Sequence, residues 1–460
     1  MGGQMHAEQT VVVEDEFGID DTLKDDLKTV AGIPDVERVI ALGDIGPSKS
    51  ETPGSIAVAT TGTVYPEFCS NVVNCGMSLL RTGLKEEDVT DELLTKFCER
   101  LQSPDERFSP DKQDTIGMLE HGAEYVVDEW GFSPDLLTNI ENGGNMFKTE
   151  NRTREIRELV PPWILSHPNA REDTPIPNLS GNHFIEFQVV DEVLDSDTAT
   201  EWGLSEGDVL VAMHGDYQLT LYINWHYANR HKFREHAALQ DKIKLQLSKL
   251  LFHAWSGRVR DLPQNWKCYN GSERFSGIDT NTVQGDRYVQ TQHAAMNFGY
   301  ANRLLANCYM ADVLADITSK ASDASLLWDV GHDTLQRESI GGEEYWIHRK
   351  AAGNAAAGKP AFISGSYNMD SFLGQGLPGA EAYLNSYDHG SGNVISYFES
   401  NGQLPKTDLS TAKYSLQEAR DSDKIKHIDR KPIERLADNV TGKGILSGVA
   451  WLRPIANIGE

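Results

Sequence analysis

The sequence predicts an α+β fold, in which short strands and a few helices are mixed along the chain. Strand-like apolar segments occupy residues 54–60, 183–190, 208–213, 326–330, 345–348 and 360–363, and a final apolar run covers 445–458. Apolar residues at helical spacing mark 88–101, 239–251 and 288–314. Because no repeating strand–helix unit connects these segments, the pattern favours mixed sheets over a doubly wound parallel sheet.

Two of the helical segments carry a well-defined apolar face. In 88–101 that face holds Val89, Leu93, Phe97 and Leu101. In 239–251 it holds Leu239, Ile243, Leu247 and Leu251. A stripe of this kind indicates a helix that packs one face on a core. The polar stretch 406–431 is expected at the surface.

The length of the chain bounds its organisation. With 460 residues it has room for one large domain or two to three ordinary ones. The first 53 residues are polar and open without the basic start and apolar core of a signal peptide. We expect a polar leader with short elements over 1–53 and a single large domain over 54–460.

Charge and cysteine content restrict the possible partners. The formal net charge of −27 repels phosphate backbones and argues against a generic nucleic-acid-binding surface, although a narrow basic groove remains compatible with it. The five cysteines are few and scattered, which favours a reducing compartment over a disulfide framework. No apolar run reaches the length of a membrane span. We therefore expect a soluble cytoplasmic protein without a membrane partner.

Four histidines and one cysteine are candidates for chemistry because of their position. His183, His214, His332 and His389 lie at the ends of strand-like runs beside Gly, Asn or Asp, and Cys75 occurs in similar company. One thiolate with several imidazoles suits a divalent transition ion such as Mn²⁺, Zn²⁺ or Co²⁺. Taken singly, each residue is more typical of an ordinary structural role, and their wide separation in sequence does not specify a site.

Seven short strings, in order from about residue 54 to the C-terminus, resemble those of the RtcB family, the GTP- and Mn²⁺-dependent ligases that join RNA 3′-phosphate and 5′-hydroxyl ends. They stand at Asn74–Gly76, Gly181–Glu186, Asn297–Arg303, His348–Lys350, Ser364–Ser366, His389–Asn393 and Leu452–Pro454. The resemblance implies a catalytic domain in which mixed sheets and helices surround a central metal and nucleotide cleft.

The resemblance also implies roles for individual residues. It assigns the metal ligands to Cys75, His183, His214 and His332, with the cysteine bridging two ions in family members. It makes His389 the nucleophile that attacks the α-phosphate of GTP and carries a covalent GMP. The nucleotide and metal pocket would be lined by Asn182, Phe184, Glu186, Ser366, Gly390 and Gly392.

Several positions depart from the family pattern, and these lie at functional places. The departures are Val72 for an aspartate that binds one ion, Gly215-Asp216-Tyr217-Gln218 for Ser-Gly-Ser-Arg, Asp333 for an asparagine, Asn393 for an arginine, Ile425 for a tyrosine and Gly459 for a lysine that contacts guanine. The loss at position 72 predicts one tightly bound cation in place of two. The last two losses predict that GTP is not strongly preferred over other nucleoside triphosphates.

Three functional hypotheses follow from the sequence. The first is an RNA ligase that acts through a nucleotidyl-histidine. The second is a diverged enzyme that uses the same metal and histidine machinery to transfer a nucleotidyl or phosphoryl group on a small phosphorylated substrate. The third, an inactive relative, is the weakest, because the candidate cysteine and histidines are all retained.

Overall fold

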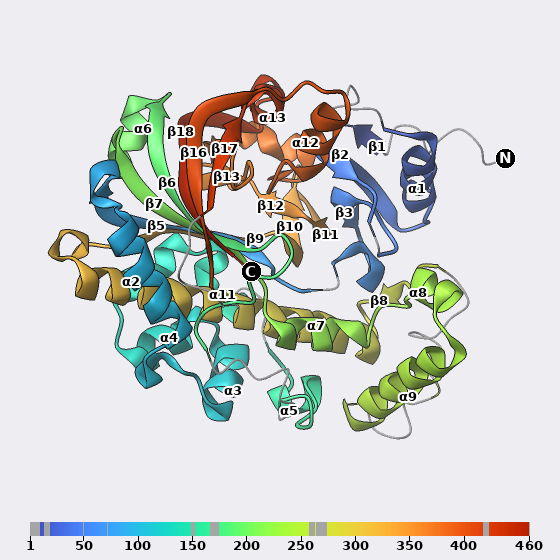
Figure 1. Ribbon diagram of the computed structural model, residues 1–460. Coiled ribbons are helices and arrows are strands. Elements are labelled where there is room, and N and C mark those ends of the chain that lie inside the picture. Colours follow the sequence, from blue (N-terminus) through green and yellow to red (C-terminus); the bar gives the residue numbers. More distant parts are fainter. Residues whose placement is uncertain are drawn as a thin grey trace.

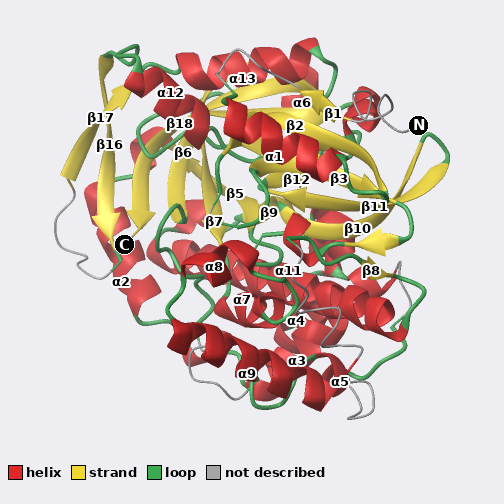
Figure 2. Ribbon diagram, turned by 90° about the vertical axis from the view of Figure 1, so that its right-hand side faces the viewer, coloured by secondary structure: helices red, strands yellow, loops and turns green. Residues whose placement is uncertain are grey.

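The computed structural model describes residues 10–12, 19–48, 50–70, 72–148, 152–165, 174–256, 263, 274–416 and 423–459. The α+β prediction is confirmed, because helices and mixed sheets alternate irregularly along the chain. In both ribbon views the strands gather in one half of the molecule and most helices in the other (Figures 1 and 2).

A mixed sheet of nine described strands forms the centre of the molecule. The path β13-β14-β18-β6-β7-β5-β9 carries β16 and β17 beside β18. These strands are β5 (Gly76–Lys85), β6 (Phe184–Val193), β7 (Asp208–Gly215), β9 (Ser325–Gly331), β13 (Pro360–Ile363), β14 (Ser371–Gly376), β16 (Lys406–Ser415), β17 (Asp423–Ile428) and β18 (Leu446–Gly459). Every pairing along this sheet is antiparallel except the one between β16 and β18.

A second sheet of five described strands has the order β1-β2-β3-β11-β10. Its members are β1 (Thr10–Val12), β2 (Val36–Gly46), β3 (Gly54–Thr60), β10 (Asp333–Ile340) and β11 (Glu343–Lys350). Two short two-stranded sheets pair β4 (Thr63–Val64) with β8 (Ile278–Asp279) and β12 (Ala352–Asn354) with β15 (Ser386–Asp388). A core that includes Ile40, Ile347 and Phe372 joins the two larger sheets.

The helices pack in two groups around the sheets. One group lies mainly below the strands in Figure 1 and holds α2 (Asp91–Gln102), α3 (Lys112–His121), α4 (Ala123–Trp130), α5 (Ile156–Leu159), α7 (Gln218–Trp225), α8 (His231–His236), α9 (Leu239–Ser256) and α11 (Val283–Ile317). The remaining helices, α1 (Asp21–Ala31), α6 (Ser196–Glu201), α12 (Gly392–Ser400) and α13 (Lys431–Gly442), lie among the strands on the other side (Figure 2).

Helix α11 runs through the middle of the helical layer and contacts α2, α3, α4, α7, β5 and β9. It has 35 residues, most of them buried, and begins at a cap in which the Thr282 hydroxyl accepts the Gly285 N–H. The helix predicted over 288–314 is confirmed, because that stretch lies within α11, and a helix that is buried on nearly all sides needs no polar face.

The apolar face predicted for 88–101 is confirmed, whereas that for 239–251 is wrong. In α2, Leu93, Phe97 and Leu101 are buried. In α9 the residues Leu239, Ile243, Leu247 and Leu251 are 72%, 50%, 54% and 63% exposed. The helix instead buries the face of Leu245, Lys249, Phe252 and His253. Helical periodicity identified the helix, but contacts made elsewhere in the fold selected which face is covered.

Two further expectations concern the surface and the N-terminal part. The stretch 406–431 is partly buried, because Thr411, Ala412, Tyr414 and His427 are enclosed. The division at residue 53 stays a prediction; β2, which precedes it, pairs along β3, which follows it. Among the described helices, none combines the length and the apolar character needed to span a bilayer.

Candidate metal and nucleotide site

The register of the central sheet brings four predicted ligand positions to one edge. Strand β5 begins beside the ends of its two antiparallel neighbours, since Gly76 pairs with Gly215 of β7 and with Gly331 of β9. Cys75 therefore lies next to His214 and His332. On the far side of β7, Phe184 at the start of β6 pairs with His214, which places His183 at the same edge.

The segment before β5 is held in an uncommon conformation that presents the thiol of Cys75. Asn74 has a left-handed backbone (φ 57°), its N–H donates to the carbonyl of Asp333 (2.7 Å), and its amide donates to the carbonyl of Met296 (2.5 Å). A non-glycine residue in this region costs free energy and persists only where neighbouring groups fix it. The carbonyl of Cys75 itself accepts the N–H of His332 (2.9 Å).

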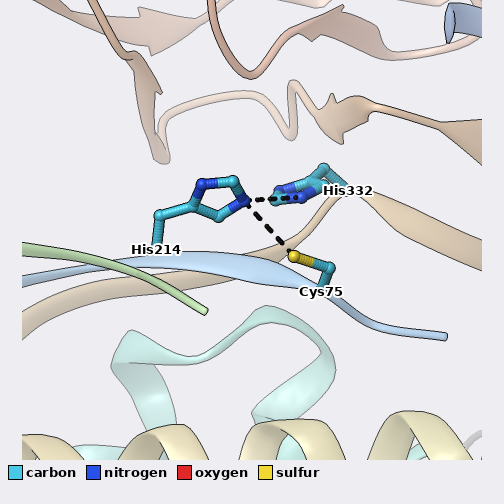
Figure 3. Close-up of side chains that lie close together, drawn as sticks. All are labelled: Cys75, His214 and His332. Carbon is cyan, nitrogen blue, oxygen red and sulfur yellow. Dashed lines mark hydrogen bonds between the residues drawn. The ribbon is translucent and has the colours of Figure 1, made fainter. Parts of the chain in front are cut away.

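Three donor atoms from these strand ends meet in the interior (Figure 3). Nε2 of His214 lies 3.3 Å from Sγ of Cys75 and 3.2 Å from Nε2 of His332. All three residues are buried. Nδ1 of His214 faces the carbonyl of Asn182 at 3.0 Å, so this nitrogen carries the proton and Nε2 presents its lone pair to the other two donors.

The separations fit a shared cation. Ligands at about 2.3 Å (sulfur) and about 2.0–2.1 Å (nitrogen) in tetrahedral arrangement are roughly 3.3–3.6 Å from one another. The two measured separations, 3.3 and 3.2 Å, lie at or just below that range. One thiol and two imidazoles also form the donor set that a borderline divalent ion prefers. The residues present therefore fit a metal site.

His183 and two carboxylates extend this group. Nε2 of His183 lies 3.6 Å from Sγ of Cys75 and 3.7 Å from an oxygen of Asp216. An oxygen of Asp333 lies 3.9 Å from Nε2 of His332. The four predicted ligands are thus brought together. Asp216 lies beside His183, and Asp333 lies beside His332.

Burial governs the protonation of the metal-binding candidates. It raises the pKa of the Cys75 thiol well above its usual value, and the nearby carboxylates of Asp216 and Asp333 raise it further. Burial also lowers the pKa values of His214 and His332 well below the usual range. The imidazoles are therefore neutral and able to coordinate, while a cation would have to displace the thiol proton.

His389 lies against the candidate metal-binding group of Cys75, His214 and His332. Its ring stacks on that of His332 with centroids 4.1 Å apart, and its centroid is 5.5 Å from that of His214. Nδ1 of His389 faces the carbonyl of Ala351 at 2.8 Å, so Nδ1 carries the proton and Nε2 keeps its lone pair. Burial lowers the pKa of His389 to about 4, and the imidazole is therefore neutral at physiological pH.

The carbonyl that orients His389 is itself fixed. Ala351 has a left-handed backbone (φ 52°), and its N–H donates to Asp333 at 3.0 Å. On the other side, the His389 turn is tied to the 364–366 turn, because Ser391 donates its hydroxyl to the carbonyl of Ser364 at 2.9 Å. Asp333, which replaces an asparagine of the family pattern, thus supports the candidate nucleophile as well as lying near the metal-binding group.

A cavity of about 550 Å³ opens over His389. All six residues predicted for the nucleotide and metal pocket line it: Asn182, Phe184, Glu186, Ser366, Gly390 and Gly392. A Cβ atom added at Gly390 would come no nearer than 3.9 Å to other protein atoms, and one added at Gly392 would meet none within 4 Å. Packing within the protein does not require glycine at either position, so both leave space that a ligand can use.

The cavity also has walls that the sequence interpretation missed. Tyr367 and Lys413 line it, and the Lys413 ammonium lies 5.5 Å from the centre of the Tyr367 ring. In the β16–β18 pairing, Lys413 stands opposite Asn457, close to the C-terminal end of the chain. Lys413 falls in the polar stretch that was assigned to the surface, and only the pairing of β16 with β18 places it at the cavity.

The second structural feature that sequence reasoning missed is a buried ion pair behind Cys75. The guanidinium of Arg303, on α11, bonds both carboxylate oxygens of Asp329 (2.8 and 2.9 Å), and both side chains are fully buried. The same guanidinium donates to the carbonyl of Asn74 (2.5 Å). It therefore fixes the residue that precedes the candidate metal ligand. The available signal was the string Asn297–Arg303, which the sequence analysis named without a role for its arginine.

This chain is similar to proteins named as RNA-splicing ligases. It is 24% identical to the tRNA-splicing ligase RtcB of Methanococcus maripaludis over 470 residues, which cover 93% of this chain and 89% of the relative. It is 26% identical to the protein of the same name from Methanopyrus kandleri, covering 71% of this chain but 34% of the relative. It is 24% identical to RNA-splicing ligase RtcB homolog 1 of Entamoeba histolytica, covering 80% and 69%.

A family model described as "tRNA-splicing ligase RtcB" matches residues 26–460. The chain therefore belongs to the RtcB family, which is a family of enzymes, and the resemblance inferred from the seven strings is confirmed. The match begins within α1, before the division predicted at residue 53.

Proposed function

We propose that this protein joins RNA 3′-phosphate and 5′-hydroxyl ends through a nucleotide carried covalently on His389. The observation that supports this most directly is the position of His389. It is a neutral imidazole whose Nδ1 is held by a backbone carbonyl, and it stacks on a member of the metal-binding group at the wall of a nucleotide-sized cavity. Its lone pair on Nε2 is available for attack on phosphorus.

The metal centre proposed for this reaction is held by Cys75, His214 and His332, with His183 beside them. Mn²⁺ is our candidate ion, with another divalent transition metal as the alternative. A divalent ion bound there neutralises negative charge that develops on phosphate oxygens. His214 keeps the lone pair of its Nε2 directed inward, because a backbone carbonyl fixes its tautomer.

The first chemical step would form a phosphorus–nitrogen bond at His389. Nε2 attacks the α-phosphate of GTP or another nucleoside triphosphate, and the bond to pyrophosphate breaks. The nucleotidyl group then passes to the RNA 3′-phosphate, which frees Nε2. The 5′-hydroxyl attacks the activated end, and the nucleoside monophosphate leaves. Gly390 and Gly392 leave room for the phosphate groups, since a glycine has no side chain and an added Cβ at either position would meet no protein atom closer than 3.9 Å.

The nucleobase would lie toward the wall formed by Glu186, Tyr367 and Lys413. Burial raises the pKa of Glu186 to about 7, although hydrogen bonds from Gln188 and Asn457 oppose this shift. Tyr367 offers an aromatic face and Lys413 a cation. With Ile425 and Gly459 in place of the family's tyrosine and lysine, we continue to expect weak discrimination between bases.

The named relatives support RNA ends as the substrate, and the strongly acidic composition motivates the alternative of a small phosphorylated molecule. The free thiols of Cys69, Cys75, Cys98 and Cys308 agree with the reducing cytoplasm that we propose as the location; Cys268 lies outside the described residues.

A labelling experiment tests the proposal. The protein is incubated with Mn²⁺ and α-labelled GTP or ATP and then run on a denaturing gel. We expect a labelled band for the wild type and for His121→Ala, an exposed histidine on α3, and none for His389→Ala. Absence of a label on the wild type with every nucleotide would refute the covalent mechanism.

Oligonucleotides then separate the two substrate classes. RNA fragments that end in 3′-phosphate and 5′-hydroxyl should be joined by the wild type and not by His389→Ala. A protein that forms the labelled adduct but leaves the RNA ends unjoined would overturn the RNA assignment and favour the small-molecule alternative.

A further inference from the structure

The turn that follows β7 places a carboxylate beside the candidate metal centre. Asp216 comes directly after Gly215, the last residue of β7, and forms an isolated bridge with Asn178. Its side chain is 16% exposed, and one of its oxygens lies 3.7 Å from Nε2 of His183. The turn is confined from outside, because a Cβ at Gly215 would lie 2.5 Å from a ring atom of Pro177.

His183 stands between this carboxylate and the thiol. Its Nε2 is 3.6 Å from Sγ of Cys75 and 3.7 Å from Oδ2 of Asp216. In the part of the chain that the structure describes, Nδ1 of the same ring is buried and has no hydrogen-bond partner. The polar contacts of this imidazole are therefore all on the Nε2 side, where the thiol and the carboxylate lie.

These separations match two donors that share one ion. For tetrahedral coordination, nitrogen and oxygen ligands at about 2.0–2.2 Å are roughly 3.4 Å apart, and sulfur and nitrogen ligands roughly 3.6 Å apart. The measured values of 3.7 and 3.6 Å exceed those figures by at most a few tenths of an ångström. A thiolate, an imidazole and a carboxylate also match the donor preferences of a borderline divalent ion.

We propose that Asp216 is a metal ligand, which holds a second divalent cation together with His183 and the shared thiolate of Cys75. This inference extends the metal centre described under the proposed function and rests on it. Val72 stands where a carboxylate in the segment before Cys75 would be expected, and a valine cannot coordinate. The carboxylate is instead supplied from the turn after β7, so the centre binds two cations and not the one that the sequence predicts.

The other acidic neighbour does not take this role. Asp333 lies on the opposite side of the group, 3.9 Å from Nε2 of His332. One of its oxygens accepts the N–H of Ala351 at 3.0 Å. Asp333 is therefore placed to act near the first cation and to support His389. Among the described carboxylates, Asp216 is the one that pairs with His183.

The test counts bound ions in the absence of nucleotide and RNA. Metal-free full-length protein is titrated with Mn²⁺, and the free ion is followed by electron paramagnetic resonance. We expect two equivalents for the wild type. Asp216→Asn should bind one equivalent with unchanged affinity and the second at least tenfold more weakly. His183→Gln should weaken the second equivalent in the same way, and the double variant should bind it more weakly than either single variant.

A matched control is Asp370→Asn, which alters a carboxylate of similar exposure (13%) that pairs with Arg430 and does not line the cavity. It should keep both equivalents. A single equivalent in the wild type, or two of undiminished affinity in Asp216→Asn, would overturn the proposal.

Folding is checked by the melting temperature. If Asp216→Asn does not fold, Asp216→Ser removes the carboxylate with a smaller side chain, and an unaltered affinity for the second ion in that variant would also count against the proposal. Because ion counts need neither GTP nor RNA, they separate failure of this inference from failure of the ligase assignment.

Discussion

Replacing Arg303 by methionine should both destabilise the fold and weaken metal binding. The change leaves the carboxylate of Asp329 buried without its partner, and breaking a buried ion pair in this way costs about 3–5 kcal/mol. The entropy of unfolding is roughly 2.1 cal/mol/K per residue, so a chain of 460 residues melts roughly 1 °C lower for each kcal/mol lost. We expect a melting temperature lowered by about 3–5 °C.

A second substitution separates the two effects. In Arg303→Met/Asp329→Leu no charge remains unpaired, and such replacements are often close to neutral, so most of the melting temperature should return. The carbonyl of Asn74 still lacks its donor, and Cys75 should still be poorly positioned. Groups that orient metal ligands typically contribute 10–100-fold to metal affinity.

The assay is differential scanning fluorimetry together with Co²⁺ titration, in which the sulfur-to-cobalt absorption reports on the thiolate. Both Arg303→Met and the double variant should bind Co²⁺ at least about tenfold more weakly. Arg100→Met, which removes an exposed ion pair with Asp316, should change the melting temperature by less than about 1 °C. Wild-type cobalt affinity in the double variant would refute the claim that Arg303 positions Cys75.

Three further predictions follow from other contacts. Gly76→Ala should lower both stability and metal affinity, because its Cβ would lie 2.4 Å from the buried guanidinium of Arg303. Gly62→Ala, whose Cβ would meet no atom within 4 Å, should change neither, and thermal melts with Co²⁺ titration compare the two variants. Burial lowers the pKa of His348 to about 4, so between about pH 6.5 and 4 the unfolded chain binds a proton that the native state does not. Up to about 3.4 kcal/mol of the free energy of unfolding is therefore lost as the pH falls through that interval. Melting temperatures measured over this pH range should fall less for His348→Gln than for the wild type, and parallel curves would contradict this. The dissociation constants for GTP, ATP, CTP and UTP should differ by less than about a hundredfold, or roughly 2.7 kcal/mol, and a larger preference for GTP would contradict this. Lys413→Met should weaken the binding of all four nucleotides several-fold.

The positions that gather in the candidate site could be picked out from sequence because they belong to short local strings. Cys75, His183, His214 and His332 each stand at the end of an apolar run, and antiparallel pairing then brings such ends together. The position of β5 could not be predicted, since its pairing with β7 and β9 joins segments more than a hundred residues apart. Recognition of the family, not periodicity, identified the common edge.

Other features depend on long-range packing and left no local signal. The covered face of α9 is the one that carries Lys249 and His253, although the alternative face holds more leucine. Lys413 reaches the cavity only because β16 pairs with β18. Asp216 was visible in the sequence as an acid in place of a small residue, but its distance from His183 gives that substitution a chemical meaning.

The length of α11 has a consequence for how this gene can change. Asn297 and Arg303 sit on one unbroken helix, where the first accepts the N–H of Met146 and the second holds Asn74. Deleting a single residue between them would turn one anchor by about 100° and move it about 1.5 Å relative to the other. Insertions and deletions should therefore be rejected throughout this helix. In a random library they should survive instead in exposed connections such as 341–342, where a Cβ added at either glycine would meet no atom within 4 Å.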